Sequence, residues 1–178
     1  MDDLATSLGM SKKTIYELYP TKTALVRAVM QGLFNTIETG VFAIRDGEQN
    51  AVEKMLEIRH LLNRVLRNER SAPEHQLMKY YPAIHRELSG QVFTHMQDTI
   101  MANLKQGKDE GLYREELDQE VAMRFYYQGC INLKDQDIFP PQRFPIKFVQ
   151  DQYIEFYLRA IVTPAGLDVL THSLNQGR

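Results

Sequence analysis

The sequence has a single cysteine, Cys130, and no tryptophan in 178 residues. One cysteine excludes a disulfide within the chain and a zinc site built on several thiolates. No apolar stretch is long enough to cross a bilayer and no signal peptide opens the chain, so we expect a cytoplasmic protein without a membrane partner. The 21 Lys and Arg residues nearly balance the 23 Asp and Glu residues, which excludes a chain-wide basic field. Any contact with nucleic acid must therefore come from a local group of cations.

Motifs of catalysis and of metal binding are also missing. The five histidines are scattered, and no two have the four-residue spacing that places two imidazoles on one helix face. The sequence has no nucleophile elbow and no phosphate-binding glycine loop. We therefore expect no enzyme, no metal and no cofactor.

Apolar residues at helical spacing occur over nearly the whole length. The pattern predicts an all-α chain with a small unit over residues 1–30 and a larger helical domain over residues 31–178. The prolines of segment 139–145 make it an extended connector. The predicted long helices cover residues 21–46, 51–70, 82–105, 119–134 and 146–162, with a short helix between Pro73 and Pro82.

Residues 3–22 have the pattern of a helix-turn-helix. Leu4, Ala5 and Leu8 fall on one side of a short first helix, and Ile15 and Leu18 fall on one side of a second. The two apolar faces can therefore close on each other. An αα-hairpin within a helical bundle is the alternative interpretation.

The junctions of these helices are encoded as well. Gly9 stands where a tight turn requires positive φ, Ser11 can cap the second helix, and Thr21 can cap the long helix that follows. The polar side of the second helix carries donors and cations suited to phosphate oxygens and base edges. These residues are Ser11, Lys12, Lys13, Thr14 and Tyr16, and Lys22 and Arg27 extend the cationic patch.

The run from Ile15 to Leu25 resembles the DNA-binding segment of the TetR (tetracycline repressor) family of bacterial regulators. Tyr16 lies in the recognition helix, Tyr19 is an aromatic residue at its end, and Thr21-Lys22 begins the next helix. Residues 107–118 and 159–166 resemble later parts of the family more weakly. The resemblance implies a homodimeric regulator, in most cases a repressor, that leaves its double-stranded DNA operator when a small-molecule effector binds. It also implies that Thr14 and Tyr16 touch the DNA backbone and adds Tyr19 to the DNA-binding set.

The start of the chain departs from the family pattern. In the family another helix precedes this pair, whereas here Met1 lies directly before the helix that should come second. We therefore expect an incomplete three-helix unit that exposes Leu4, Leu8 and Ile15 and binds DNA poorly in this form. The alternative function is a helical, dimeric, small-molecule-binding or interaction protein that has lost DNA binding.

The resemblance also implies an effector pocket and a dimer interface in the larger domain. Abundant methionine and aromatic side chains favour an apolar or aromatic effector. The predicted pocket residues are Met55, Met78, Tyr81, Phe93, Met96, Met123, Tyr126 and Tyr127. The helices 119–134 and 146–162 have more apolar surface than one small domain needs, which favours a four-helix interface between two subunits over a monomer core. The predicted interface residues are Phe125, Gly129, Tyr153, Phe156 and Tyr157.

Overall fold

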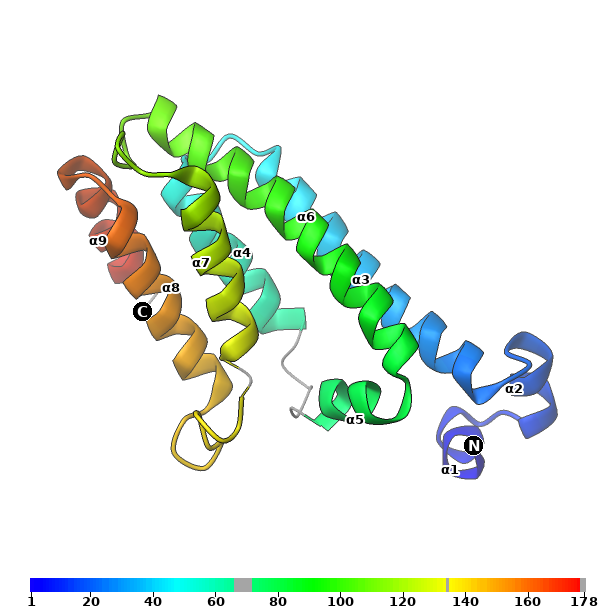
Figure 1. Ribbon diagram of the computed structural model, residues 1–178. Coiled ribbons are helices and arrows are strands. Elements are labelled where there is room, and N and C mark those ends of the chain that lie inside the picture. Colours follow the sequence, from blue (N-terminus) through cyan, green and yellow to red (C-terminus); the bar gives the residue numbers. More distant parts are fainter. Residues whose placement is uncertain (66–71, 134, 177–178) are drawn as a thin grey trace.

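The computed structural model describes residues 1–65, 72–133 and 135–176. Within these ranges the chain is helical and contains no named strand, so the predicted all-α fold class is confirmed (Figure 1). Residues 66–70 of the predicted fourth helix lie outside the described residues. The helices are α1 (Asp2–Leu8), α2 (Lys12–Leu18), α3 (Lys22–Arg45), α4 (Ala51–Val65), α5 (Ala72–Tyr80), α6 (Pro82–Asp109), α7 (Gln119–Asn132), α8 (Ile146–Ile161) and α9 (Pro164–Gln176).

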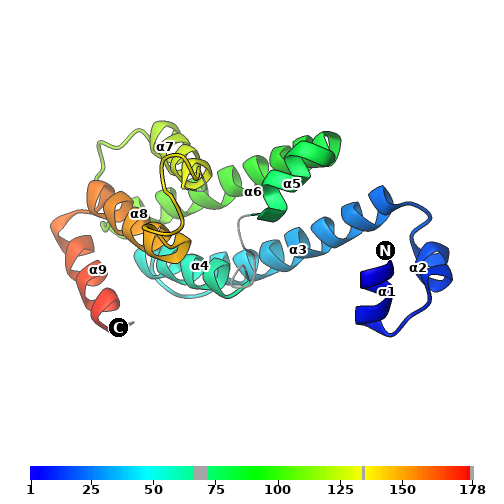
Figure 2. The same cartoon turned by 90° about the horizontal axis from the view of Figure 1, so that it is seen from below.

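Two long helices, α3 and α6, lie side by side and determine the length of the molecule (Figure 1). The pair α1 and α2 lies at the N-terminal end of α3, far from α7, α8 and α9 (Figure 2). At the other end, α4 contacts α3, α6, α8 and α9, while α7 contacts α6 and α8. The helix-turn-helix is thus joined to the larger helical domain mainly through α3.

The main core lies around α4. Met55, Leu104, Met123, Leu158 and Leu170 are almost fully buried and belong to α4, α6, α7, α8 and α9 respectively. Five helices therefore share one continuous apolar cluster, the arrangement that a single helical domain requires.

A second, smaller cluster joins the N-terminal half of α3 to the other helices. Leu77 of α5 and Ile84 and Leu88 of α6 are buried in it, and Val26 and Met30 of α3 pack against them. α3 is otherwise poorly covered, because Ile44 is its one buried residue and Val29, on its predicted apolar face, is exposed. This helix is therefore a half-exposed connector rather than a core element.

Helix α9 was not predicted from the sequence. It begins at Pro164, where proline is well tolerated in the first helical turn, and Thr163 Oγ1 accepts a hydrogen bond from the Gly166 amide at 3.1 Å. A side chain at position 166 would collide with the Leu112 carbonyl, so Gly166 permits the start of α9 to approach that segment closely. The sequence signal, Thr-Pro before an apolar periodic run, was present.

Candidate DNA interface and effector region

The turn between α1 and α2 has the predicted geometry. Gly9 adopts the left-handed conformation, with φ 62° and ψ 26°, and the Met10 amide donates to the Ala5 carbonyl at 3.0 Å. Ser11 Oγ then accepts a hydrogen bond from the Thr14 amide at 3.0 Å and caps α2. The break at Gly9 and the restart at Ser11 are therefore both confirmed.

Helix α2 presents cations to solvent. The Lys13 side chain is 87% exposed and lies 4.0 Å from Glu17, and Lys12 forms an exposed ion pair with Asp2 of α1. The Lys12 ammonium, hydrogen-bonded to Asp2, lowers the pKa of that carboxyl. Exposed ion pairs are weak and screened by salt, so phosphate oxygens can replace either carboxylate.

The other predicted DNA-binding residues differ in exposure. Tyr16 and Lys22 are exposed, whereas Thr14 and Tyr19 are half-buried. The Ser11 and Thr14 hydroxyls lie 2.9 Å apart and bond to each other. Ser11 therefore has a structural role as a cap in addition to any DNA contact.

The pair α1 and α2 has a very small core. Its buried side chains are Ala5 and Ile15, so the expectation that Ile15 would be exposed is wrong. Helices α1 and α2 contact each other, and Ile15 of α2 is only 3% exposed. Leu8 is 56% exposed and Leu18 is 64% exposed, while Leu4 is half-buried, which leaves an apolar surface on this unit.

Polar contacts join α3 to α6 along their length. Arg27 forms an ion pair with Glu87 near the helix-turn-helix, and Glu38 contacts His95 Nδ1 at 2.6 Å further along. The His95 ring also meets the Phe34 ring edge-on, with centroids 5.4 Å apart. Contacts of this kind set the position of α3 along α6.

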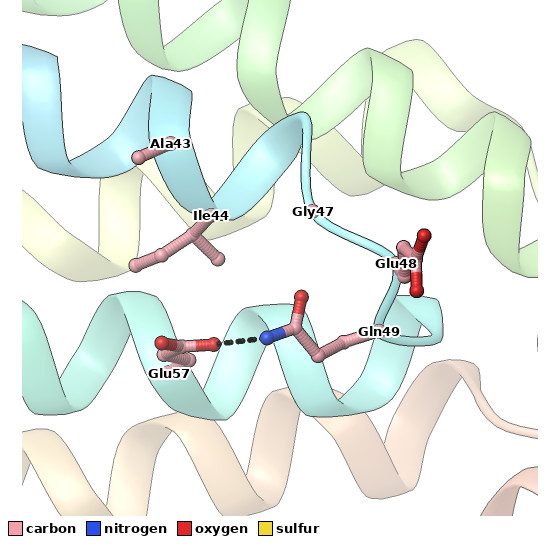
Figure 3. Close-up of a pocket in the computed structure, with 6 residues that line it drawn as sticks. All are labelled: Ala43, Ile44, Gly47, Glu48, Gln49 and Glu57. Carbon is pink, nitrogen blue, oxygen red and sulfur yellow. Dashed lines mark hydrogen bonds between the residues drawn. The ribbon is translucent and has the colours of Figure 1, made fainter.

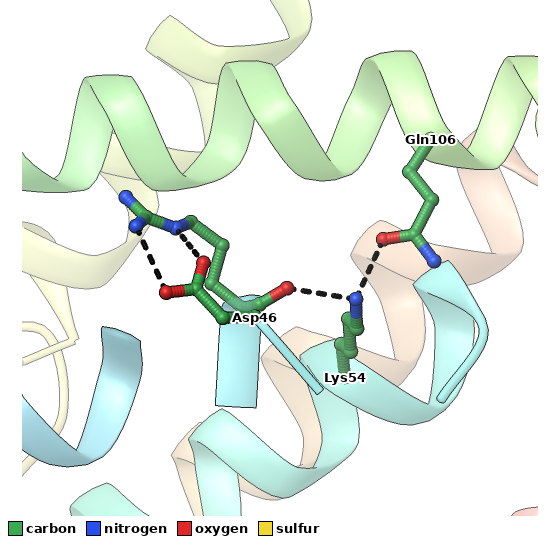
Figure 4. A network of polar contacts seen from close by, with 4 residues as sticks. Asp46, Lys54 and Gln106 are labelled. Carbon is green, nitrogen blue, oxygen red and sulfur yellow. Dashed lines mark hydrogen bonds and ion pairs between the residues drawn. The ribbon is translucent and has the colours of Figure 1, made fainter. Parts of the chain in front are cut away.

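The C-terminal end of α3 is held by a buried lysine (Figure 4). Lys54 of α4 donates to the Arg45 carbonyl at 2.8 Å and to Gln106 Oε1 of α6 at 3.0 Å. Gln106 in turn donates to Glu110, which accepts the Ala51 amide at the start of α4 at 2.9 Å. The ends of three helices are thereby linked in one network.

Two of the hollows on the described part of the chain contain no predicted pocket residue in their lining. The larger, of about 600 Å³, is an open depression at the turn from α3 to α4 (Figure 3). Its polar lining includes Glu48, Gln49 and Glu57, and Gln49 donates to Glu57 at 3.1 Å. The smaller, of about 260 Å³, is lined by residues of α4 and α8.

The predicted pocket residues occupy three different environments. Met55, Met123 and Tyr126 are buried in the main core, and Phe93, Met96 and Tyr127 are partly buried against it. The Phe93 and Tyr127 rings meet edge-on, with centroids 4.7 Å apart. Tyr81 packs against the second cluster instead, and Met78 is exposed. Six of the eight predicted residues are therefore brought together.

The predicted dimer residues fall into two groups. Phe125 is 69% exposed on α7 and Phe156 is 72% exposed on α8. Gly129 instead faces the Tyr153 ring of the same chain, and the Tyr153 hydroxyl lies 2.9 Å from the Phe125 carbonyl, to which it donates. Tyr157 is buried and donates to a carbonyl of α7. Burial raises the pKa of both Tyr153 and Tyr157, so these phenols remain donors.

Residues 1–65, 72–133 and 135–176 offer neither a cluster of metal ligands nor a membrane-spanning helix. Among those residues, no group of three or more His, Cys, Asp or Glu side chains could hold a metal ion. No helix in the same ranges is long and apolar enough to cross a membrane.

Similarity to known proteins is found at the level of structure. No protein-family model matches the chain, and no curated protein matches its sequence. The ketosteroid transcriptional regulator KstR2 of Mycobacterium tuberculosis is 18% identical, with 90% of this chain and 83% of that chain covered at a TM-score of 0.56. A TetR-family regulatory protein from Rhodococcus RHA1 is 17% identical, with 89% and 83% covered at 0.61. The TetR-family regulator PfmR from Thermus thermophilus is 16% identical, with 88% and 86% covered at 0.60.

This chain has the TetR fold. The predicted architecture, a helix-turn-helix followed by a larger helical domain, is confirmed by these likenesses. The second helix of the helix-turn-helix is α2, and α3 connects it to the domain that holds the main core.

Proposed function

We propose that this chain is a ligand-responsive transcriptional regulator of the TetR family. It binds a double-stranded DNA operator as a homodimer and acts as a repressor that a small apolar or aromatic effector releases. One observation carries the proposal. α2 presents Lys12, Lys13 and Tyr16 to solvent at one end of α3, while Lys54 holds the other end of α3 in the larger domain.

The charge distribution supports a local DNA contact. The chain has a net charge of −2, so attraction to phosphate must come from the exposed cations of α2 and the start of α3. Lys12 and Lys22 are suited to phosphates, and Lys13 is suited to a base edge. In a dimer, two copies of α2 enter successive major grooves about 34–36 Å apart.

The exposed aromatic residues of α7 and α8 support the dimer. Phe125 and Phe156 are mostly exposed, and Val121 and Ile131 of α7 are about half exposed. Full burial of one such side chain is worth roughly 1.5–3 kcal/mol, and apolar residues of this kind are typical of homodimer interfaces. A second copy that packs α7 and α8 against these helices would remove this surface from water.

The packing around α6 supports an effector site beside the main core. Phe93, Met96 and Tyr127 are partly buried there, next to the buried Met55 and Met123. Methionine side chains repack readily, so an apolar or aromatic molecule can enter between them. Such a molecule shifts α6 relative to α4, and the links to α3 transmit the shift to α2. The effector needs only to prefer one spacing of the two α2 helices.

Crosslinking and sequencing of the DNA bound to the protein in its own cells tests this function. We expect a small set of sites that contain an inverted repeat, and increased transcription from the adjacent promoters when the gene is deleted. Decreased transcription at those promoters would show an activator. Recovery of no discrete sites would contradict the regulator itself.

The effector class has a separate test. Phenylnaphthylamine, a neutral aromatic fluorophore, should gain fluorescence in the protein and lose it in Met96→Glu. Val29→Glu, which places the same charge on the exposed side of α3, is the matched control and should leave the signal unchanged. Equal fluorescence in the native protein and Met96→Glu would contradict an effector site beside the main core.

A further inference from the structure

The smaller hollow lies where α4 contacts α8, and each of its lining residues carries a polar or charged group. Its four lining residues are His60, Asn63 and Arg64 of α4 and Lys147 in the first turn of α8, around about 260 Å³. This differs from the main core, where methionine and aromatic side chains meet. The lining of this hollow therefore favours a polar ligand.

The protonation of His60 follows from its neighbour. Arg59 Nη2 lies 2.8 Å from His60 Nε2, and a guanidinium has donors but no acceptor. His60 Nε2 must therefore accept, which places the proton of the neutral ring on Nδ1. Desolvation, followed by the charge of Arg59, lowers the pKa of His60 and favours this neutral form. Nδ1–H then remains as a donor with no partner among the described residues.

Positive charge around the hollow exceeds negative charge. Asp151 of α8 forms an ion pair with Arg59, whose Nε lies 3.5 Å from Oδ1. The same oxygen accepts a hydrogen bond from Asn63 Nδ2 at 3.3 Å. Arg64 and Lys147 form no ion pair within the described ranges. The charges that act on His60 are thus three permanent cations, Arg59, Arg64 and Lys147, and one carboxylate, Asp151, that is already engaged. An added anion would relieve their mutual repulsion.

We propose that this hollow binds a small oxyanion, a carboxylate or phosphate group, through Arg64, Lys147 and the Nδ1–H of His60. Arginine suits both groups, since its planar donors match two oxygens of either. The volume lies below the roughly 300–1,000 Å³ of sites for whole drug-sized ligands, so the ligand is a small acid or the acidic end of a larger molecule. This site does not depend on the proposed function.

A bound anion would connect two parts of the molecule. It would link the C-terminal half of α4 to the first turn of α8, whereas Lys54, nearer the start of α4, holds the end of α3. The N-terminus of α8 adds a favourable dipole for an anion next to Lys147. The site is therefore placed to stiffen the helix that anchors α3.

Titration with inorganic phosphate, and separately with succinate, tests the site on the full chain. The nuclear magnetic resonance signals of the His60 ring should shift saturably at millimolar concentrations of at least one probe. The double variant Arg64→Gln with Lys147→Gln should weaken that binding at least about tenfold, because both charge-assisted contacts are lost. The exposed residue Arg86 of α6 has no partner in the described ranges, and Arg86→Gln should leave binding unchanged.

The two probes distinguish the two ligand chemistries, and an unchanged melting temperature of each variant excludes a folding defect. The swap of Arg64→Lys with Lys147→Arg keeps both charges and should retain most of the binding. Shifts that do not saturate, or that Arg86→Gln reduces as strongly as the double variant, would show diffuse attraction and overturn the site. Unaltered binding in the double variant would overturn it as well.

Discussion

Lys54 Nζ lies 2.8 Å from the carbonyl oxygen of Arg45, the last residue of α3. The lysine is only 6% exposed, and its second acceptor is Gln106 of α6. A buried ammonium is tolerated only where its N–H groups are paired. One side chain of α4 therefore fixes the end of α3 to α6, which makes the position of α3 depend on the packing of the larger domain.

The first prediction concerns this link. Lys54→Met keeps much of the side-chain volume but removes the donor, so the Arg45 carbonyl and Gln106 face an apolar group. We expect the free energy of unfolding in urea to fall by about 1–3 kcal/mol, the cost of unsatisfied buried acceptors. Lys105→Met, on the exposed side of α6, should change it by less than about 0.5 kcal/mol. Equal stability of both variants would show that the link is unimportant.

The second prediction concerns DNA. In a form extended upstream by the helix that the family pattern adds, Lys12→Ala or Lys22→Ala should weaken binding to all sequences. Each should also reduce the slope of log affinity against log salt by about one unit, as expected for one lost phosphate contact. Lys105→Ala, near the C-terminal end of α6, is the control and should not alter the slope. Filter binding at several salt concentrations measures this. Unchanged slopes for both Lys12→Ala and Lys22→Ala would contradict the proposal that α2 is the recognition helix.

The third prediction concerns assembly. Phe156→Glu should yield a monomer in sedimentation at micromolar concentration, because a charge would enter a desolvated helix contact. Val29→Glu replaces a similarly exposed apolar residue on α3 and should remain dimeric. Gly129→Arg is a poorer test, since the arginine would also displace Tyr153 within its own chain. A monomeric native protein would contradict the assembly.

The fourth prediction concerns mobility. The pair α1 and α2 buries only Ala5 and Ile15, so its amides should exchange with deuterium far faster than those of α4. DNA should slow exchange in residues 4–18 by covering α2. Exchange in α1 and α2 as slow as in α4 without DNA would show that the small core is sufficient.

The fifth prediction concerns alkaline pH. Burial raises the pKa of Tyr113 and Tyr126 well above the ordinary value of 10.0, so the folded state keeps protons that the unfolded chain loses. Stability is therefore fully present below pH 10 and falls above it, by up to about 1.4 kcal/mol per pH unit for each such tyrosine. Tyr126→Phe should make this fall shallower, whereas Tyr80→Phe, on an exposed residue, should not.

The helix junctions were predictable because their causes are local. Gly9, Ser11 and Thr21 act on residues within three or four positions, and each is found in its expected role. The length of α3 followed from the cap at Thr21 and the break near Asp46. The resemblance to the TetR family was recognisable for the same reason, because consecutive residues, 15–25, carry it.

Contacts between residues of different helices were not predictable in the same way. Helical spacing places Tyr153, Phe156 and Tyr157 on an apolar part of α8, but it does not say that two of them pack against α7 of the same chain while Phe156 stays exposed. The hollow between α4 and α8 was missed for the same reason. His60, Arg64 and Lys147 form no motif in the sequence and meet only because α4 contacts α8.

Selection of bound duplexes from a random DNA pool, by the purified protein extended upstream by the helix that the family pattern adds, tests the central claim most directly. The account predicts enrichment of an inverted repeat whose half-sites lie about 10 base pairs or a multiple of this apart, with the enrichment lost when Lys12 and Lys13 are both replaced by alanine. A pool that remains random after repeated rounds, or a site that the Lys12→Ala, Lys13→Ala variant binds as tightly, would contradict it.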